Sequence, residues 1–186
     1  MRAILVFPTM LFLINNLCLQ SQEFPTPKPL PEHKILANEA GTWDCAVKMY
    51  LSGPNNSPTE FTGIEENKLV GDGLFLSTKF TCPMGNRVFK GQGLMGYHPG
   101  KNSYTGTFVN NFTISPAQTT GTYNAQTRTM TQSSEVYDQS TGKTLQQKQI
   151  TTWENDSAKH FTIFLVVDSG DEKVDVKLME MSAKKR

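Results

Sequence analysis

Hydrophobic and polar residues alternate along most of the chain after residue 40. In the segment that begins at Gly41, every second residue is apolar, from Trp43 through Cys45 to Met49. A period of two places these side chains on one face of a β-strand and the intervening ones on the other. No stretch between Gly41 and Ser182 keeps the apolar period of an amphipathic helix, so we expect strands throughout.

Turn signals rich in glycine, proline, asparagine and aspartate separate these segments, as at Gly71-Asp72-Gly73 and Pro99-Gly100-Lys101-Asn102. They divide the chain into about ten strands. The last strand carries Val174, Val176 and Leu178 on one face. Short connections make neighbouring strands antiparallel, and closing the meander removes its exposed edges. The pattern therefore predicts an all-β fold: a single antiparallel up-and-down β-barrel of about ten strands.

The N-terminal part of the chain does not show the alternating pattern of a strand. Residues 22–31 are rich in proline, and the spacing of the prolines favours an extended polyproline conformation, so we assign these residues to a proline-rich linker. The stretch from Glu32 to Ala40 has helical character, with Ile35 and Leu36 as its apolar contact. We expect a short helix that plugs one end of the barrel, and we place the barrel domain at residues 32–186.

The first residues carry the pattern of a secretory signal. A basic residue, Arg2, precedes an apolar run from Ala3 to Ile14, which is too short to span a bilayer. We assign residues 1–21 to a signal peptide with cleavage near Ser21. The protein is therefore expected to be exported, to a periplasmic or extracellular location.

The chain has three cysteines. Lipid attachment at Cys18 is not expected, because Asn16 and Leu17 are not the small residues that a lipidation site carries before its cysteine. Cys45 and Cys82 should both point inward by alternation. In an exported protein they could form a disulfide or remain unpaired core residues, and we expect a third strand between their two strands. No histidine stands in register to activate either thiol.

Composition narrows the classes of partner. The chain has 186 residues, enough for one domain with a buried core, and a formal net charge of +1. A balanced charge gives no electrostatic reason to expect a nucleic acid or an anionic membrane as partner. We expect no nucleic-acid partner and no transmembrane segment, and the sequence carries no signal for an oligomeric state.

Short motifs connect the chain to a known family. Gly41-Thr42-Trp43 resembles the opening of the first strand in the calycin superfamily of lipocalins, fatty-acid-binding proteins and nitrobindins, where the indole closes one end of the barrel. A wider set resembles the bacterial family of domain of unknown function fifteen seventy-nine: His33-x-x-Leu36, Gly73-Leu74-Phe75-Leu76, Gly91-x-Gly93-x-x-Gly96-Tyr97, Tyr104, and Gly121-Thr122-Tyr123 with Thr129-Met130-Thr131.

This resemblance covers nearly everything after the linker. It implies a lipocalin-like barrel, often exported, with no established reaction. Nitrobindins ligate haem through a histidine near the C-terminus, and this chain has none there. The resemblance therefore does not extend to haem binding.

Gly91, Gly93 and Gly96 have the spacing of a dinucleotide-binding loop. That loop requires a helix directly after the glycines, whose N-terminus holds the pyrophosphate. Here the glycines lie inside an extended run that leads into a turn. We interpret them as positions where the barrel wall bends or another segment approaches closely.

Catalytic and metal-binding signatures are not evident. The chain has three histidines: His33, His98 and His160. None has the spacing of a zinc or protease motif. The carboxylates at Glu65, Glu66, Asp72 and 168–172 are expected on turns or facing outward, without the inward pairing that acid–base catalysis needs. We therefore predict no catalytic residues, no metal site and no cofactor.

Aromatic and methionine side chains supply the candidate binding site. Those expected around the barrel interior are Trp43, Phe61, Phe89, Met95, Tyr97, Tyr104, Phe108 and Tyr123. Such a wall, with a few hydroxyl groups, describes an apolar small-molecule pocket and equally describes a filled core. Face assignments depend on uninterrupted alternation, because one bulge reverses every later residue of a strand.

Three functions follow from these observations. The leading hypothesis is a non-enzymatic exported protein that binds a small apolar or amphipathic molecule in the barrel interior. One alternative is a solid-core module that binds another envelope protein through an exposed apolar patch. The second alternative is an enzyme with an acid or base at the barrel mouth, which a carboxylate or histidine deep among the aromatic residues would support.

Overall fold

The computed structural model describes residues 26–50, 53, 55–170 and 172–186. A 3-10 turn, η1 (Pro31–His33), and a helix, α1 (Lys34–Glu39), precede the strands. The strands are β1 (Gly41–Met49), β2 (Thr59–Val70), β3 (Phe75–Met84), β4 (Arg87–His98), β5 (Ser103–Asn110), β6 (Ala117–Asn124), β7 (Thr129–Asp138), β8 (Lys143–Asn155), β9 (Ala158–Ser169) and β10 (Glu172–Lys185), with a second 3-10 turn, η2 (Pro99–Lys101), after β4. The expected signal peptide, Cys18 and the start of the expected linker lie outside the described residues.

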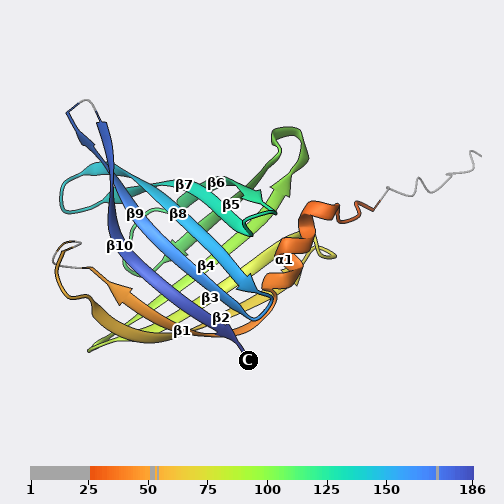
Figure 1. Ribbon diagram of the computed structural model, residues 1–186, viewed down its shortest axis with the longest axis horizontal. Helices are drawn as coiled ribbons and strands as arrows, with labels where there is room; N and C mark the ends of the chain where they lie inside the picture. Colours follow the sequence, from red (N-terminus) through yellow and green to blue (C-terminus); the bar gives the residue numbers. More distant parts are fainter. Residues whose placement is uncertain (1–25, 51–52, 54, 171) are drawn as a thin grey trace, which may run out of the picture.

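Each strand pairs antiparallel with its neighbour in the sequence, and β1 also pairs with β10, so the sheet closes into a barrel (Figure 1). The closing ladder runs from the pair Trp43–Lys185 to the pair Met49–Met179. Closure gives both terminal strands a hydrogen-bonding partner. The predicted up-and-down barrel of about ten strands is confirmed.

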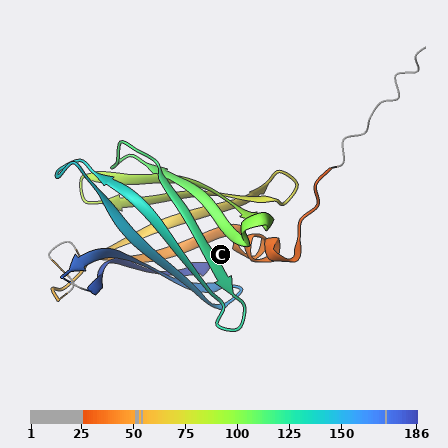
Figure 2. The same ribbon diagram turned by 90° about the horizontal axis from the view of Figure 1, so that it is seen from above.

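The helix α1 covers one end of the barrel, as Figures 1 and 2 show. We call this the plugged end, and the opposite end, which holds the β1–β2, β3–β4, β5–β6, β7–β8 and β9–β10 connections, the loop end. Ile35 and Leu36 of the helix pack against a cluster of buried side chains from the strands: Leu76, Tyr104, Met130 and Trp153. The Tyr104 hydroxyl donates a hydrogen bond to the Glu32 carbonyl oxygen at 2.8 Å. The predicted plug helix is confirmed.

The face assignment of β10 needs a correction. The register of β10 against β9 shifts between Lys177 and Met179. Val174 and Val176 face inward before this irregularity, and Met179 faces inward after it, opposite Ile163. The prediction that Leu178 shares a face with the two valines is therefore wrong, because one extra residue reverses the alternation.

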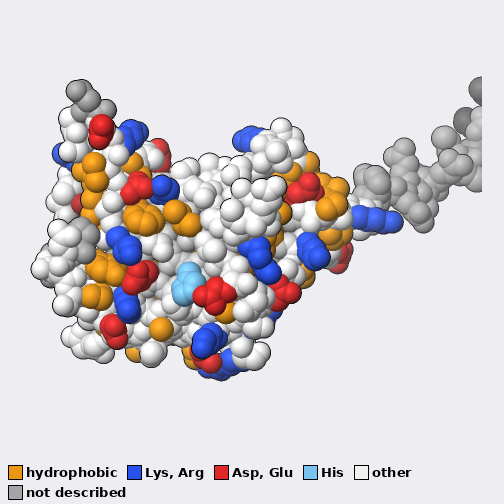
Figure 3. All heavy atoms as spheres, in the orientation of Figure 1, with side chains coloured by type: hydrophobic (Ala, Val, Ile, Leu, Met, Phe, Trp, Pro, Cys, Tyr) orange, Lys and Arg blue, Asp and Glu red, His pale blue; other side chains and the backbone are white. Residues whose placement is uncertain are grey.

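The outer surface mixes charges of both signs, and Figure 3 shows basic and acidic side chains interspersed over one face of the barrel. This distribution agrees with the net charge of +1. In the part of the chain that the structure describes, no helix combines the length and the apolar character needed to cross a bilayer.

Candidate functional site

The interior of the barrel is filled at its plugged end. The inward-facing side chains there are almost fully buried: Trp43 is 0% exposed, Leu76 3%, Tyr104 4%, Met130 3% and Trp153 5%. They pack against the plug helix or against one another. This half of the interior is an ordinary close-packed core.

Toward the loop end, several inward-facing side chains are only half-buried: Phe61, Phe80, Phe89, Phe108, Phe161 and Ile163. Val47 and Cys82 lie among them and are buried, and four of these rings, Phe61, Phe80, Phe89 and Phe161, pack against the cluster to which they belong. At the rim, Val167 and Val174 face each other across β9 and β10 and are 38% and 44% exposed. The inner wall therefore keeps partly exposed apolar side chains toward the loop end, and we take this half as the candidate site.

Glycines in the wall let phenyl rings lie close to the backbone of neighbouring strands. A Cβ atom at Gly91 would stand 2.3 Å from Cζ of Phe108, and one at Gly63 would stand 2.9 Å from Cζ of Phe80. At Gly93 the distance to Phe108 Cδ2 would be 3.2 Å. The close approach predicted for the glycines of this segment is confirmed at Gly91 and Gly93.

Opposite these rings, uncharged polar side chains line three consecutive strands, β6, β7 and β8. We call this set the polar stripe: Thr119, Gln132, Ser134, Gln147 and Gln149. The ladders place Thr119 beside Ser134, Ser134 beside Gln147, and Gln132 beside Gln149. Within the stripe, Gln149 Nε2 donates to Ser134 Oγ at 3.1 Å, and Gln132 Nε2 donates to Thr119 Oγ1 at 3.5 Å. The interior thus has an apolar wall and a polar wall.

The sequence reasoning missed the polar stripe because it searched for aromatic residues. A signal was nevertheless present. Gln132 and Ser134 continue the alternation that begins at Met130, so the inward face of that segment turns polar after one residue.

The side chains predicted to form one interior wall divide between the two halves of the barrel. At the plugged end lie Trp43 and Tyr104, which are buried, and Met95, Tyr97 and Tyr123, which are half-buried and pack against the core. In the loop half lie Phe61, Phe89 and Phe108, which are half-buried, and the first two pack against the second core cluster. Phe80 and Phe161 also line the loop half, although the prediction did not include them.

A buried charged cluster lies between the plug helix and the core. We call it the floor network: Glu39 of α1, Glu65 and Asn67 of β2, and Lys159 of β9. Lys159 Nζ lies 2.5 Å from Glu39 Oε2 and 2.7 Å from Glu65 Oε1. The Asn67 amide donates to Glu65 Oε1 at 2.5 Å and to the Glu39 carbonyl oxygen at 3.1 Å, and the Trp153 indole donates to Glu39 Oε1. These contacts join α1, β2, β8 and β9.

Burial sets the protonation behaviour of this network. Desolvation raises the pKa of the Glu39 carboxyl above its ordinary value, with Lys159 opposing the change and Glu65 adding to it. Burial acts to lower the pKa of Lys159, but attraction from the two carboxylates outweighs it and the pKa is raised. The ammonium group also stands 4.5 Å from the centre of the Trp43 ring. The lysine therefore remains charged and forms ion pairs with both glutamates.

The position of Glu65 corrects an expectation. It was predicted to lie on a turn or to face outward, and it faces inward opposite Trp43. The pattern around it carried the signal, because Phe61 and Gly63 share its phase on β2. An inward carboxylate supports the alternative of an enzyme only if it is free to react, and Glu65 instead binds Lys159 and Asn67.

Both described cysteines are buried free thiols. Cys45 on β1 and Cys82 on β3 have β2 between them, as expected, and they form no disulfide. Burial raises the pKa of the Cys45 thiol to about 12, and burial also raises the pKa of Cys82. Both thiols are therefore protonated at neutral pH and behave as small core residues.

The histidines lie away from the loop half of the interior. His33 is buried at the plugged end, where its Nδ1 accepts a hydrogen bond from the Leu30 backbone N–H at 3.0 Å. Its ring packs edge-on against Tyr97 of β4. His98 is exposed beside η2.

His160 forms a small network on the outer face of β9. Its Nε2 lies 2.6 Å from Glu154 Oε1, and its Nδ1 lies 3.0 Å from Ser182 Oγ. All three residues are exposed, so water competes for each hydrogen bond. Among the described residues, no group of histidine, cysteine, aspartate and glutamate side chains could hold a metal ion.

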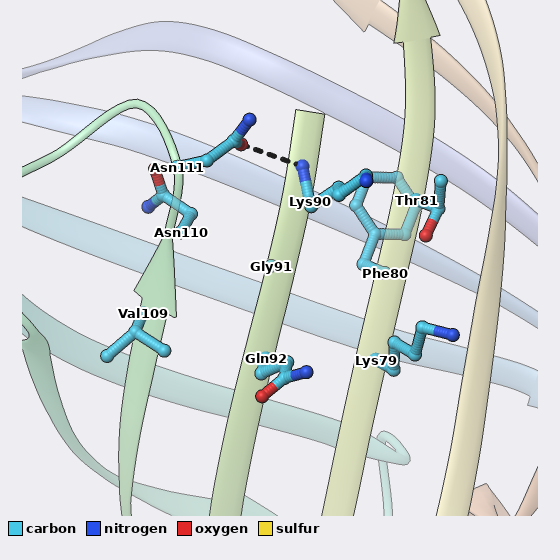
Figure 4. Close-up of a pocket in the computed structure, with 9 residues that line it drawn as sticks. All are labelled: Lys79, Phe80, Thr81, Lys90, Gly91, Gln92, Val109, Asn110 and Asn111. Carbon is cyan, nitrogen blue, oxygen red and sulfur yellow. Dashed lines mark hydrogen bonds between the residues drawn. The ribbon is translucent and has the colours of Figure 1, made fainter. Parts of the chain in front are cut away.

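A separate hollow of about 570 Å³ lies against β3, β4 and β5. Figure 4 shows its lining residues, which are Lys79, Phe80, Thr81, Lys90, Gly91, Gln92, Val109, Asn110 and Asn111. The exposed Lys79, Lys90, Gln92 and Val109 occupy outward positions of their strands. Asn111 Oδ1 accepts a hydrogen bond from the Lys90 backbone N–H at 2.8 Å. These mixed side chains do not converge on one point, so the hollow is not the candidate site.

A solved structure has the same fold. The structure of the S-type phycobiliprotein lyase CPES from Guillardia theta matches with a TM-score of 0.56, over 84% of this chain and 93% of the lyase, at 9% sequence identity. This likeness concerns the fold alone. No curated protein matches the sequence.

A family match covers the described barrel. The family described as "Protein of unknown function (DUF1579)" matches residues 28–185, which include the plug helix and every strand of the barrel. The resemblance inferred from the short motifs is confirmed. The chain belongs to the DUF1579 family, and its fold is a lipocalin-like ten-stranded barrel.

Proposed function

We propose that this protein binds a small apolar or amphipathic molecule in the loop half of its barrel. The observation that carries this proposal is the partial exposure of inward-facing phenyl side chains such as Phe61, Phe89 and Phe108. Folding normally removes phenyl groups from water, and each one left on a concave inner wall can gain free energy when a ligand covers it. The fold shared with a phycobiliprotein lyase is compatible with this role, although 9% identity transfers no ligand and no residue.

The role that fits the interior is binding and not catalysis. The two buried carboxylates of the barrel, Glu39 and Glu65, are held by Lys159 in the floor network. The buried thiol of Cys45 is protonated at neutral pH, since burial raises its pKa to about 12. The side chains that line the loop half are phenyl, aliphatic, amide and hydroxyl groups, which bind and orient a molecule without supplying an acid or a base.

Export completes the proposal. The basic Arg2 and the apolar run from Ala3 to Ile14 support a cleaved leader, and a binding protein outside the cytosol would carry its ligand between compartments or retain it there. Expression of the full chain in a bacterial host, followed by fractionation and intact-mass measurement, tests this point. A product that keeps Met1 to Ile14 and stays with the cytosol would contradict export without touching the binding proposal.

A fluorescence titration tests binding. N-phenyl-1-naphthylamine, a neutral fluorophore that brightens in apolar surroundings, should saturate at one molecule per barrel. Ala117 lies on the inward face of β6 opposite Phe108, so Ala117→Trp should fill the site and abolish the signal. Ala46 is exposed on the outward face of β1, and Ala46→Trp is the matched control that should bind normally. Equal binding by both variants would overturn the proposal.

Native mass spectrometry of the protein purified gently from its own host then identifies the natural ligand class. A co-purifying molecule of constant mass, lost in Ala117→Trp and retained in Ala46→Trp, is the expected result. A clean protein mass in both cases, together with no fluorophore binding, would favour a solid-core interaction module.

A further inference from the structure

Below its rim, the inner wall of the loop half carries a polar stripe but no charged side chain. Between the plugged end and the rim, Glu65 and Lys159 are the only charged residues at inward positions of the described strands, and both belong to the floor network. Each is already paired there, because Lys159 forms ion pairs with Glu65 and with Glu39 of the helix. A ligand carboxylate, phosphate or ammonium placed among the phenyl rings would therefore lose its hydration without finding a partner of opposite charge. At the rim itself, charged residues again share the inward phase of their strands: Arg87, Asp138, Lys143 and Glu172.

The polar stripe itself has unused hydrogen-bonding capacity. The amide nitrogens of Gln132 and Gln149 donate to hydroxyls of the stripe, whereas their oxygens accept no hydrogen bond from a described residue. The side chain of Gln147 forms no hydrogen bond with the described part of the chain. A stripe of amides that does not satisfy itself needs water or a ligand against it, since an amide left dry and unpaired costs about 1–3 kcal/mol.

The remaining wall of the loop half is apolar. Phenyl groups stand at inward positions on four consecutive strands: Phe61 on β2, Phe80 on β3, Phe89 on β4 and Phe108 on β5. Each is half-buried, and the first three also pack against the core cluster that contains Val47 and Cys82. In Figure 1 the strands β2 and β3 lie on the opposite side of the barrel from β7 and β8, which agrees with their places in the closed sheet. The site is therefore two-sided, with rings facing amides.

We propose that the ligand is an uncharged amphipathic molecule, such as an amide or an alcohol with an apolar body, whose polar group lies on the stripe of Gln132, Ser134, Gln147 and Gln149. This inference rests on the proposed function, because it requires that the loop half binds a ligand. A neutral amide group supplies a donor and an acceptor, which match the free oxygens of Gln132 and Gln149 and the free amide of Gln147. The apolar body lies against the phenyl rings of β2 to β5.

The rim offers the competing arrangement. Arg87 begins β4 at the loop end, and its guanidinium stands 4.2 Å from the centre of the Phe112 ring. An anionic ligand could hold its charged group at this arginine and leave the polar stripe to water. This competitor makes a different prediction about ligand charge, so the two can be separated.

Competition between a matched pair of ligands tests the inference on the full-length protein as processed by its host. Dodecanamide and dodecanoate differ in one polar group, and each is titrated against bound N-phenyl-1-naphthylamine at neutral pH. Dodecanamide should displace the fluorophore at a concentration about tenfold lower than dodecanoate, the difference expected from one to two net hydrogen bonds. Displacement of the fluorophore by dodecanoate at an equal or lower concentration would overturn the inference. If Arg87→Gln then abolished displacement by dodecanoate, the carboxylate of the ligand would lie at the rim.

Variants of the stripe give the second arm. In the double variant Gln147→Leu and Gln149→Leu, the roughly tenfold preference for dodecanamide over dodecanoate should disappear, with both competitors measured against the fluorophore affinity of that same variant. Gln146→Leu, on the outward face of β8, is the matched control and should keep the preference. If the double variant fails to fold, the ligand pair on the unchanged protein still decides. Absence of fluorophore binding from the start would refute the proposed function, whereas binding without preference for the amide would refute only this inference.

Discussion

The ring of Phe108 on β5 lies against the backbone of Gly91 on β4, so closely that a Cβ atom at Gly91 would stand 2.3 Å from Cζ of the phenyl group. The ring can occupy this place along the wall only because residue 91 has no side chain. Any side chain there would push the ring toward the middle of the barrel. The place of the Phe108 ring along the inner wall therefore depends on the glycine at position 91.

Gly91→Ala should destabilise the protein by about 1–3 kcal/mol, because the added methyl group forces Phe108 out of its position. It should also weaken N-phenyl-1-naphthylamine binding, since the displaced ring enters the site. Urea unfolding measures the first effect and fluorescence titration the second. Gly100→Ala is the control, because its Cβ atom would meet only the exposed ring of His98.

A double-mutant cycle identifies the cause. If Phe108 is the obstacle, Gly91→Ala should cost much less in a Phe108→Ala background. A cost that does not depend on residue 108 would show that the strand itself, and not the ring, requires glycine.

Lys159→Met should destabilise the protein by about 3–5 kcal/mol, because it leaves the carboxylates of Glu39 and Glu65 buried without their cation. The triple variant Lys159→Met, Glu39→Gln and Glu65→Gln should recover much of this loss, since no buried charge remains. Lys184→Met, on the outward face of β10, is the matched control and should change stability little. Denaturant unfolding measures the free energy of unfolding of all three variants. If Lys159→Met lowers it no more than Lys184→Met does, the floor network does not stabilise the protein.

Glu39 should make stability fall as pH rises. Desolvation raises its pKa in the folded protein above the ordinary value of 4.5, so the folded state holds the proton more tightly than the unfolded state. The stabilising contribution of this proton is complete below about pH 4.5 and is lost as pH rises through the folded-state pKa. The stability of Glu39→Gln relative to the unchanged protein should therefore improve with increasing pH, as urea unfolding at a series of pH values would show.

Asp138 provides the opposite case as a control. Hydrogen bonds from Thr141 and Ser140 lower the pKa of its carboxyl below the ordinary value of 3.8. Its stabilising contribution is present above that pH and is lost as pH falls through the folded-state pKa. Asp138→Asn should therefore be less stable than the unchanged protein above this pH range, and the difference between the two should shrink as the pH falls. If the stability of Glu39→Gln relative to the unchanged protein instead declines as the pH rises, the pKa of Glu39 is not raised.

The two buried thiols should resist modification in the folded protein. In a Cys18→Ser background, which leaves only Cys45 and Cys82, a disulfide reagent should react slowly at neutral pH and rapidly in denaturant. The reason is that burial raises the pKa of both thiols, that of Cys45 to about 12, and shields them from the reagent. Ser57→Cys, in the exposed β1–β2 connection, gives the reference rate. Native thiols that react at this reference rate would mean that the core opens readily.

Local features of the sequence were enough to predict the fold. Alternation in segments such as Trp43 to Met49, and turn residues such as Pro99 and Gly100, act over a few positions and therefore survive in any tertiary context. The plug helix was predicted for the same reason. The glycines at 91 and 93 were interpreted as sites of close approach, but the sequence did not reveal that Phe108 approaches them.

The candidate site was predicted less well, because its composition depends on contacts between distant segments. In β10 the alternating pattern gave a wrong prediction, because one irregularity moves Leu178 off the face of Val174 and Val176. In β2 the same pattern would have given the right prediction, because Glu65 is in phase with Phe61 and Gly63, which face inward.

The sequence by itself determined the barrel, its strand number, the helix at one end and the family, since each rests on short-range patterns. Only the tertiary structure decided that Lys159 meets Glu39 and Glu65, residues 120 and 94 positions away, and that the amides of β7 and β8 face the phenyl rings of β2 to β5. It also decided which inward-facing side chains are almost fully buried, such as Trp43 and Tyr104, and which stay half-buried toward the loop end, such as Phe108. The physical reason is that a period of two assigns a side chain to a face, whereas the packing of an interior depends on the summed volumes and pairings of side chains from every strand at once.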